Sequence, residues 1–407
     1  MTHNLQKMAM KTASTTRLAY RYRIYPTKAQ VYVLEKTLGV CRDVYNSLVH
    51  ERTVLYELQG KSPGWAEQCR EVTSWKDTHA ELLFANAQVL QNVVKRVDLA
   101  FQAFFRRVKL GEDPGYPRLK GKGQYDSLTY PQYEGGFSFT QGRLRLSKIG
   151  DIAIHLHRDV EGNIKTCTVR RTKTGKWFAC FSCEVEPEHL EPSTEEVGID
   201  VGIKVFAALS NGEFIDNPRF FRTEEPALAK AQRRFDAVKH KHRTKARRKA
   251  KKVVARIHER IRNRRHDFVH QTARRLVNRF GVIAVEALQV VNMMATPKPK
   301  PDPENEGQYL PNGASAKAGL NKSIADVSWS MFRTALTMKA ENAGRLVVAI
   351  NPAYTSQMCS GCGNIQKKSL SVRTHKCLGC GLVLDRDTNA AVNIKALGQY
   401  SLAALTA

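Results

Sequence analysis

The sequence predicts a multidomain α+β protein in which an antiparallel β-rich part with inserted helices is followed by an α/β layer part. The chain has 407 residues, which is more than one ordinary hydrophobic core accommodates. Short alternating segments separated by turn residues fill 118–190, a pattern typical of antiparallel strands. From Val197 onward, apolar strand-like segments alternate with helical ones, and this order predicts a layered α/β fold.

The chain carries a large excess of positive charge. Its 65 Lys and Arg residues against 38 Asp and Glu give a net charge of +27. Such an excess destabilises a compact fold unless a polyanion offsets it, so nucleic acid is the expected partner. An anionic membrane surface is disfavoured, because the sequence has no basic amphipathic anchor and no apolar run of about 18 residues.

The N-terminus and the cysteines indicate a reducing compartment. Residues 1–16 contain no apolar signal segment and are expected to form a disordered tail. Nine cysteines, an odd number, argue against a disulfide framework. Cys180 and Cys183 have the spacing of a metal-binding pair, but strand alternation would put them on opposite faces, which favours free thiols.

Residues 17–26 open the β-rich part. Apolar and basic residues alternate there, which predicts a half-buried strand with a basic outer face. Thr27 and Gln30 match a capping box for a helix that we expect to end at Gly39. A second helix is expected over 40–58.

The next helix is expected over 81–110. Its apolar residues recur at alternating steps of four and three, which is typical of a helix packed in a core. The polar face carries Gln91 and Lys95 and could meet a phosphate backbone. The Gly- and Pro-rich segment 111–123 marks a domain boundary.

The strand-rich segment 118–190 predicts a small antiparallel barrel or sandwich. The strand at 17–26 fits the same domain. In that arrangement the helices of 27–117 are an insertion into a β-domain.

The remaining segments alternate between strand and helix. In order, they are an apolar strand and hairpin from 197 with the turn at Asn211-Gly212, basic helices to 280, a strand at 281–288, a linker at 295–321, a helix at 324–343, a strand at 345–350, and a last helix starting near Asp387. The linker is rich in Pro, Gly and Asn and is expected to be mobile.

One helical segment concentrates more than half of the excess charge. Residues 230–265 contain 17 Lys and Arg against two acids, a net charge of +15. A charge run is usually a solvated helix face. At this density the charges would repel one another along the helix, so contact with nucleic acid is the favoured interpretation.

Two cysteine pairs predict a structural zinc site. Cys359, Cys362, Cys377 and Cys380 form a CxxC-x14-CxxC pattern in which each pair flanks a tight Gly-containing turn. This spacing lets four thiolates reach one tetrahedral ion. Four thiolates fill the coordination sphere, so no catalysis is expected at this metal.

Three carboxylates are the catalytic candidates. Asp200 and Glu286 lie on apolar strands, and Asp387 starts the last helix. Singly, Asp200 could be a turn former and Asp387 a helix N-terminal carboxylate. Glu286 loses solvation unless it meets a cation. Together they could hold one or two Mg²⁺ ions, which prefer oxygen ligands and support phosphodiester cleavage.

Several of these motifs resemble the TnpB family, the RNA-guided nucleases of insertion sequences that are related to type V CRISPR effectors. The motifs are GIDVG at 198–202, VEAL with Glu286, TSQMCSGCG at 355–363, and CxxCGxxxDRDxNAAxN at 377–393. The resemblance covers nearly the whole chain, although the linker 295–321 is longer than in relatives.

The resemblance implies a fold and a division into domains. It implies an RNase H-like (RuvC) α/β nuclease domain with an inserted zinc ribbon, and an antiparallel β wedge domain with an inserted helical recognition domain. The expected boundaries are a tail at 1–16, the wedge at 17–26 and 118–190, the recognition domain at 27–117, the nuclease domain at 195–355 and 382–398, the ribbon at 356–381, and a tail at 399–407. Asp385 is expected to be supportive rather than a metal ligand.

The resemblance also implies an activity and partners. A metal-dependent RNA-guided DNA endonuclease would bind a transposon-derived guide RNA and cleave double-stranded DNA beside a short flanking motif, in the prokaryotic cytoplasm near the nucleoid. An RNA-guided repressor without cleavage and an accessory or strand-joining transposition protein are the alternatives. Expected nucleic-acid contacts are Gln91, Lys95, Arg118, Lys120, Arg243, Lys245, Arg247, Arg248, Lys251 and Lys252. Whether the protein is a monomer or a dimer is left open.

Overall fold

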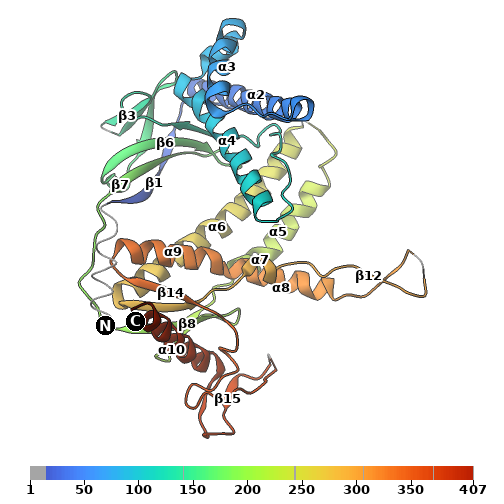
Figure 1. The fold of residues 1–407 in the computed structure, drawn as a ribbon. Coiled ribbons are helices and arrows are strands. Elements are labelled where there is room, and N and C mark those ends of the chain that lie inside the picture. The colour runs from blue at the N-terminus through green and yellow to red at the C-terminus, as the bar shows by residue number, and fades with distance from the viewer. Residues whose placement is uncertain (1–14, 141, 243, 306, 370, 407) are drawn as a thin grey trace. The chain divides into compact units, whose positions relative to one another are not determined.

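The chain divides into two compact units, Thr15–Glu186 and Pro187–Ala407 (Figure 1). A computed structural model describes residues 15–140, 142–242, 244–305, 307–369 and 371–406. The expected N-terminal tail lies outside the described residues up to Ser14, and Thr16 already begins a strand. None of the helices in these ranges is long and apolar enough to span a membrane.

One seven-stranded antiparallel sheet forms the base of the first unit. The strand order is β2-β6-β7-β1-β5-β4-β3. The bounds are β1 (Thr16–Tyr25), β2 (Ser127–Tyr130), β3 (Phe137–Thr140), β4 (Arg143–Leu146), β5 (Gly150–His155), β6 (Asn163–Arg171) and β7 (Trp177–Val185). Strand β1 pairs with β7 and β5, so the first strand belongs to this sheet as expected. Along β7, Cys183 is buried and Cys180 lies on the other face, also as expected.

The expectation of a barrel or sandwich is wrong for this unit. Within the described residues the pairing ends at β2 on one side and β3 on the other, so the sheet is open and single. Its apolar face shares one hydrophobic cluster with side chains of the inserted helices, such as Leu38 and Val94. The helices therefore cover the face that a second sheet would cover in a sandwich.

The inserted helices are α2 (Lys28–Gln59), α3 (Trp65–Thr78), a 3₁₀ turn (Ala80–Phe84) and α4 (Ala87–Lys109). The capping box at Thr27 and Gln30 is confirmed, with both reciprocal hydrogen bonds formed. The predicted break at Gly39 is wrong, because α2 continues through it. A glycine inside a helix costs only about 1 kcal/mol, and buried residues on both sides of it, Leu38 and Cys41 among them, outweigh that cost.

The helical insertion differs from the sequence prediction in two further ways, in the start of α4 and in the presence of α3. Helix α4 begins only after Asn86, whose side chain accepts a hydrogen bond from the backbone N–H of Gln88. Helix α3 was not predicted, because it buries only Gln68 and Val72 and so has almost no apolar stripe.

A five-stranded mixed sheet forms the centre of the second unit, which confirms the layered α/β prediction. Its order is β10-β9-β8-β11-β14, in which β8, β11 and β14 run parallel, β9 runs antiparallel to β8, and β10 runs antiparallel to β9. The strands are β8 (Glu196–Val201), β9 (Val205–Leu209), β10 (Phe214–Asp216), β11 (Val282–Glu286) and β14 (Leu346–Ile350). The helices are α5 (Phe220–Asp236), α6 (Lys245–Arg279), α7 (Val290–Met293), α8 (Ala314–Val327), α9 (Trp329–Asn342) and α10 (Arg386–Thr406).

Helices cover both faces of this sheet (Figure 1). Ile199 and Val285 point to the face covered by α6 and α9, and they share a core with Leu276 and Phe332. Residues one position away, such as Ala284, pack with Ile394 of α10 on the opposite face. Because strand residues alternate between faces, each position on β8 and β11 is assigned to one of these two layers.

The linker 295–321 is shorter than expected. Helix α8 already begins at Ala314, and a two-residue hairpin, β12 (Lys300–Pro301) with β13 (Tyr309–Leu310), forms within the linker. Near the start of α8, Lys317 and Asn321 donate hydrogen bonds to the carbonyl oxygens of Met293 and Met294 at the end of α7. These contacts hold the first turns of α8, which contain few apolar residues from which the sequence would predict a helix.

The expected tail 399–407 is helical through Thr406, so that expectation is wrong for 399–406. Gly398 lies against Ala284 of β11, and Gln399 donates a hydrogen bond to Glu196 of β8. The last turns of α10 are thus held on the sheet, which explains why the helix does not stop at 398.

Candidate active site and metal centre

Asp200 lies on β8, the central strand of the mixed sheet, which pairs with β9 and β11. Ile199 points to the α9 face, so Asp200 points to the face that α10 covers. Burial raises the pKa of Asp200 well above its usual range, and the charges of Glu286 and Asp387 raise it further. A carboxyl whose pKa responds to two other carboxylates lies within electrostatic reach of both.

Glu286 is the last residue of β11, the parallel neighbour of β8. The register pairs Val285 with Ile199, so the next residues on the two strands, Glu286 and Asp200, share one face and one sheet edge. Burial raises the pKa of Glu286, and a hydrogen bond from Thr355 opposes that shift. The Thr355 hydroxyl donates to Glu286 Oε1 at 2.6 Å.

Asp387 lies in the first turn of α10. The preceding acid, Asp385, caps this helix, because its Oδ1 accepts hydrogen bonds from the backbone N–H groups of Asp387 and Thr388 at 2.9 and 3.2 Å. The Asp387 carboxylate itself is left for other partners, and among the described residues it forms an ion pair with Arg373 at 3.9 Å. The two acids of the DRD sequence therefore have different structural environments.

Close backbone packing holds α10 on the sheet beside Asp200. A Cβ added to Gly198 would lie 2.1 Å from the carbonyl oxygen of Ala391 and 2.4 Å from the backbone nitrogen of Lys395. Only glycine permits this approach. Gly198 is two residues from Asp200 on the same face of β8, so the contact fixes the distance between that strand and the helix that begins with Asp387.

Two asparagines of α10 connect the helix to the loop that carries the first cysteine pair. Asn393 donates hydrogen bonds to the carbonyl oxygens of Thr355 and Met358, at 2.9 and 2.7 Å. Asn389 also donates to Met358, at 2.8 Å, and accepts from the backbone N–H of Ser360. Both asparagine side chains are buried. Thr355 is thereby held from one side by α10 and bonded on the other to Glu286.

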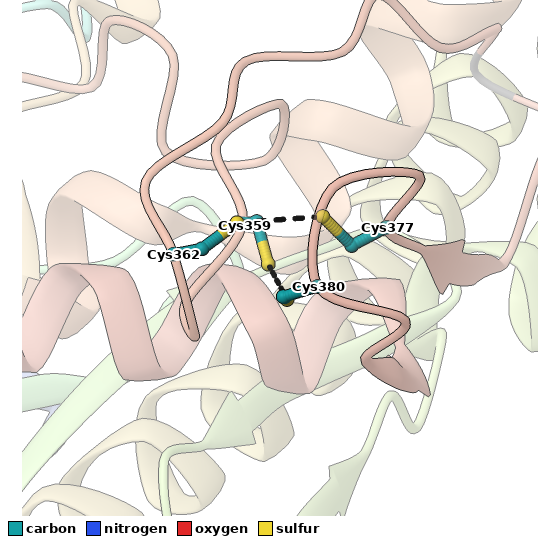
Figure 2. A group of neighbouring side chains, drawn as sticks. All are labelled: Cys359, Cys362, Cys377 and Cys380. Atoms are coloured by element: carbon teal, nitrogen blue, oxygen red, sulfur yellow. Dashed lines mark hydrogen bonds between the residues drawn. The ribbon is translucent and has the colours of Figure 1, made fainter.

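The four cysteines converge as the sequence predicts (Figure 2). The Sγ atoms of Cys359 and Cys380 are 3.6 Å apart, and those of Cys362 and Cys377 are 3.5 Å apart. All four sulfurs lie within 4.8 Å of one another. A backbone hydrogen bond from Cys380 is the main reason that the pKa of Cys377 is lowered to about 6, which favours the thiolate that a metal requires. The set fits one tetrahedral ion.

The three carboxylates are less tightly drawn together than the cysteines. Among the described residues, only the cysteine group has all its ligand atoms within 4.8 Å of one another. Burial raises the pKa of Asp200 and of Glu286, and neighbouring carboxylates of like charge in a buried site repel one another. A bound cation would lower the electrostatic energy of the three carboxylates. Their oxygen atoms are the ligands that a hard divalent ion prefers.

The predicted nucleic-acid residues are mostly at the surface. Gln91 and Lys95 are exposed one turn apart on α4. Arg118 is exposed in the loop after α4, and Lys120 is half-buried beside the ring of Tyr45. On α6 the exposed positions are Lys245, Arg248, Lys251 and Lys252, whereas Arg247 is half-buried and Arg243 lies outside the described residues.

Sequence reasoning did not single out Thr355, Asn389, Asn393 or Gly198. All four lie inside motifs that the sequence analysis used for other residues, namely TSQMCSGCG, DRDxNAAxN and GIDVG. A buried asparagine pair spaced by one helical turn is a signal that could have identified the contact between α10 and the loop.

Three family models match parts of the chain. A model described as "Probable transposase" matches residues 180–296, and one described as "Cas12f1-like, TNB domain" matches 329–394. A third, described as "Helix-turn-helix domain", matches 10–61. In the described part of that last range the chain forms strand β1 and the single helix α2 rather than two helices.

Relatives cover nearly the whole chain. A protein of Streptomyces pristinaespiralis named "Putative RNA-guided DNA endonuclease" is 34% identical, over 93% of this chain and 89% of its own. A protein of Escherichia coli K12 with the same name, InsQ, is 31% identical over 95% and 93%. The fold is similar to that of Cas12f1 solved with sgRNA and target DNA, with a TM-score of 0.57, 14% identity, and coverage of 94% and 99%. The extent and identity of the first two matches show that this chain belongs to the TnpB family.

Proposed function

We propose that this protein is an RNA-guided DNA endonuclease that uses a guide RNA to select double-stranded DNA and cleaves it by metal-dependent phosphodiester hydrolysis. The observation that carries the proposal is that Asp200 and Glu286, at the ends of two adjacent parallel strands, face the helix α10, whose first turn carries Asp387. The raised pKa of Asp200, to which the charges of Glu286 and Asp387 contribute, agrees with this arrangement. Relatives along nearly the whole chain bear the name of this activity.

The sheet order and the position of the acids favour an RNase H-like nuclease domain. Three consecutive antiparallel strands, β8 to β10, are followed by β11 and β14, which run parallel to β8. The acids lie at the ends of β8 and β11 and at the start of α10. In open α/β sheets, sites form outside the carboxyl ends of parallel strands. The corresponding roles are metal ligation by Asp200, Glu286 and Asp387.

Each acid would reach the reacting phosphate through a bound cation. One or two Mg²⁺ ions would activate a water and stabilise the leaving oxygen when bound. Asp200 supplies a carboxylate that the sheet holds rigidly, and Glu286 supplies a second carboxylate oriented by Thr355. Asp387 adds a third from the first turn of α10, where the helix N-terminus lowers the cost of its negative charge.

The cysteine group would bind a structural Zn²⁺. Its two pairs would clip together the loop after β14 and the hairpin of β15 (Thr374–Lys376) and β16 (Val383–Asp385). Strand β16 leads directly into α10. The zinc would therefore hold the start of the helix that carries Asp387, without an open coordination position for chemistry.

Guide RNA and target DNA are the proposed partners. The exposed cations of α6 would bind the phosphate backbone, while base pairing with the guide would select the sequence. Gln91 would lie near the short flanking motif, and Lys95, exposed one turn further along α4, would meet the phosphate backbone. The three carboxylates repel a phosphate, which is also negatively charged. A phosphate can therefore approach them only if bound cations offset this repulsion.

In the decisive experiment, the protein is expressed from its native locus and purified, and the RNA bound to it is sequenced. The complex is then incubated with a DNA library whose flanking sequence is randomised. With Mg²⁺, double-strand cleavage beside an enriched flank supports the proposal. Asp200→Ala should bind the same RNA and target without cutting.

The other candidate functions predict different results in the same assay. A repressor would bind the target and never cut it, and a strand-joining transposition protein would produce joined DNA ends. Cleavage by Asp200→Ala would remove Asp200 from the site.

A further inference from the structure

A cavity of about 480 Å³ opens on the unit Thr15–Glu186, away in sequence from the catalytic acids. The loop before β3 forms one wall and the turn between β4 and β5 forms the other. The lining residues are 134–138 and 145–150. Pockets of this size hold small-molecule ligands, nucleotides among them.

The walls of this nucleotide-sized pocket are already in place. Ser147 donates a backbone hydrogen bond to the carbonyl of Gly136 at 3.0 Å, so the two walls are joined at the base. Asn86, the cap of α4, donates to the Ser147 hydroxyl at 2.9 Å. A Cβ on Gly136 would lie 2.8 Å from Gln88 Oε1, which leaves no room for a side chain there. That oxygen is shielded and has no hydrogen-bond partner in the described chain.

Two of the five described non-glycine residues with a left-handed backbone conformation line the pocket. Glu134 and Lys148, one on each wall, have left-handed backbone conformations with φ of 61° and 69°. Such conformations cost non-glycine residues on the order of 1–3 kcal/mol and cluster at ligand sites. Glycine would relieve the strain at either position, yet the chain places a charged side chain at each.

The polar groups in the pocket are of two kinds. Arg145 and Lys148 are exposed cations on one wall, and the nearest acid to Arg145 is Asp151 at 4.0 Å. Cations of this kind bind phosphate. Glu134 on the other wall is a carboxylate, which repels phosphate but accepts hydrogen bonds from the amino groups of a nucleobase. A ligand that satisfies both walls carries an anionic phosphate and a base with N–H donors.

We infer that this pocket binds one unpaired nucleotide of the bound RNA, with its phosphate on Arg145 and Lys148 and its base facing Glu134. This inference rests on the proposed function, because it takes RNA as the partner. RNA loops and bulges present unpaired bases, whereas a DNA duplex must pay a few kcal/mol to extrude one. RNA is therefore the favoured source of the nucleotide.

Photocrosslinking tests the assignment directly. The protein is produced with its native locus in cells supplied with thiouridine, irradiated, and purified with its RNA. After nuclease digestion, mass spectrometry should find a nucleotide adduct on the peptide that contains 134–150. The same protein carrying Ser138→Trp, which fills the pocket without changing charge, should lose this adduct and bind the RNA about tenfold more weakly.

Charge variants distinguish RNA binding by cations in the pocket from nonspecific attraction of RNA to surface cations. Arg145→Gln should weaken RNA binding several-fold more than Arg143→Gln, an exposed arginine on the same face of β4 that does not line the pocket. Lys148→Gly removes the second cation and suits the left-handed backbone, so it should weaken binding while preserving or raising the Tm.

Each outcome decides between specific possibilities. If RNA remains bound but no adduct falls within 134–150, and Ser138→Trp binds like the wild type, the pocket assignment is overturned and the proposed function stands. If the wild-type protein retains no RNA, the proposed function and the pocket fail together.

Discussion

The hydroxyl of Thr355 donates a 2.6 Å hydrogen bond to Glu286 Oε1, although the two residues are 69 positions apart. This bond joins the loop before the first cysteine pair to the end of β11. Asn393 of α10 holds the backbone of Thr355 from the other side. One threonine therefore connects the cysteine-bearing loop, the sheet edge that carries Glu286 and the helix that carries Asp387.

Replacing Thr355 with Val should alter the pH dependence of cleavage. Burial raises the pKa of Glu286, and the Thr355 hydrogen bond, which favours the ionised form, opposes that rise. Without it, the pKa should rise further, so cleavage should fall most at acidic pH and recover as the pH increases. A charge-assisted bond of this kind is worth about 1.5–3 kcal/mol, or roughly tenfold to a hundredfold in rate at low pH. Thr355→Ser, which keeps the hydroxyl, is the control. A loss of equal size at every pH would mean that Thr355 acts only on the fold.

Sequence patterns were sufficient for the α/β layers of the second unit and for the cysteine group, because alternation, apolar runs and CxxC spacing are local properties. They could not reveal the Thr355–Glu286 bond or the approach of Ala391 to Gly198, since both depend on how distant segments pack. The failures have the same origin. Gly39 looked like a helix end, and the buried stripe of α2 overrode it.

Removing the charge of Asp200 should stabilise the protein in the absence of divalent metal. The pKa of Asp200 is raised in the folded chain, so the unfolded chain releases this proton at lower pH. The free energy of unfolding therefore falls as the pH rises from about 4, the unfolded pKa, towards the folded one. Asp200→Asn removes this penalty and should raise the Tm at neutral pH.

Asp216→Asn is the control for the Tm of Asp200→Asn. Asp216 is an exposed acid on β10, so its replacement should leave the Tm nearly unchanged. Added Mg²⁺ should raise the Tm of the wild type and have little effect on Asp200→Asn, because ligand binding stabilises only the protein that holds it. Equal stabilisation of both proteins by Mg²⁺ would contradict a site at Asp200.

Gly198→Ala should displace α10 from the sheet. The new methyl group would lie 2.1 Å from a backbone oxygen of that helix, and backbone cannot move aside as a side chain can. Overpacking of this kind costs about 1–3 kcal/mol. Differential scanning calorimetry should show the loss, and cleavage should fall further than stability alone explains, because Asp387 moves with the helix. Gly319→Ala in α8, where a methyl group meets open space, should instead raise the Tm slightly. A neutral Gly198→Ala would mean that the helix is not held there.

Cys377→Ser should destabilise the hairpin that leads into α10. Losing one of four ligands weakens a tetrahedral zinc site, and the metal-binding energy is part of the folding energy. The expected results are less than one bound zinc per chain by elemental analysis and a lower Tm. Cys180→Ser, on the half-buried face of β7 in the other unit, should retain the full metal content. Unchanged zinc content in Cys377→Ser would exclude this cysteine as a ligand.

Neutralising the exposed cations of α6 should flatten the salt dependence of nucleic-acid binding. For each duplex phosphate that the protein no longer neutralises, the slope of log K against log salt becomes shallower by about 0.9. Changing Lys245, Arg248, Lys251 and Lys252 to Gln should therefore reduce the slope by up to about four such steps. A variant with the same change in charge at exposed positions elsewhere is the control, with Gln at Lys28, Lys61, Lys173 and Lys300. If both variants change the slope equally, α6 contributes only net charge. A change confined to the α6 variant identifies this helix as the backbone-binding surface, because net charge is matched and only position differs.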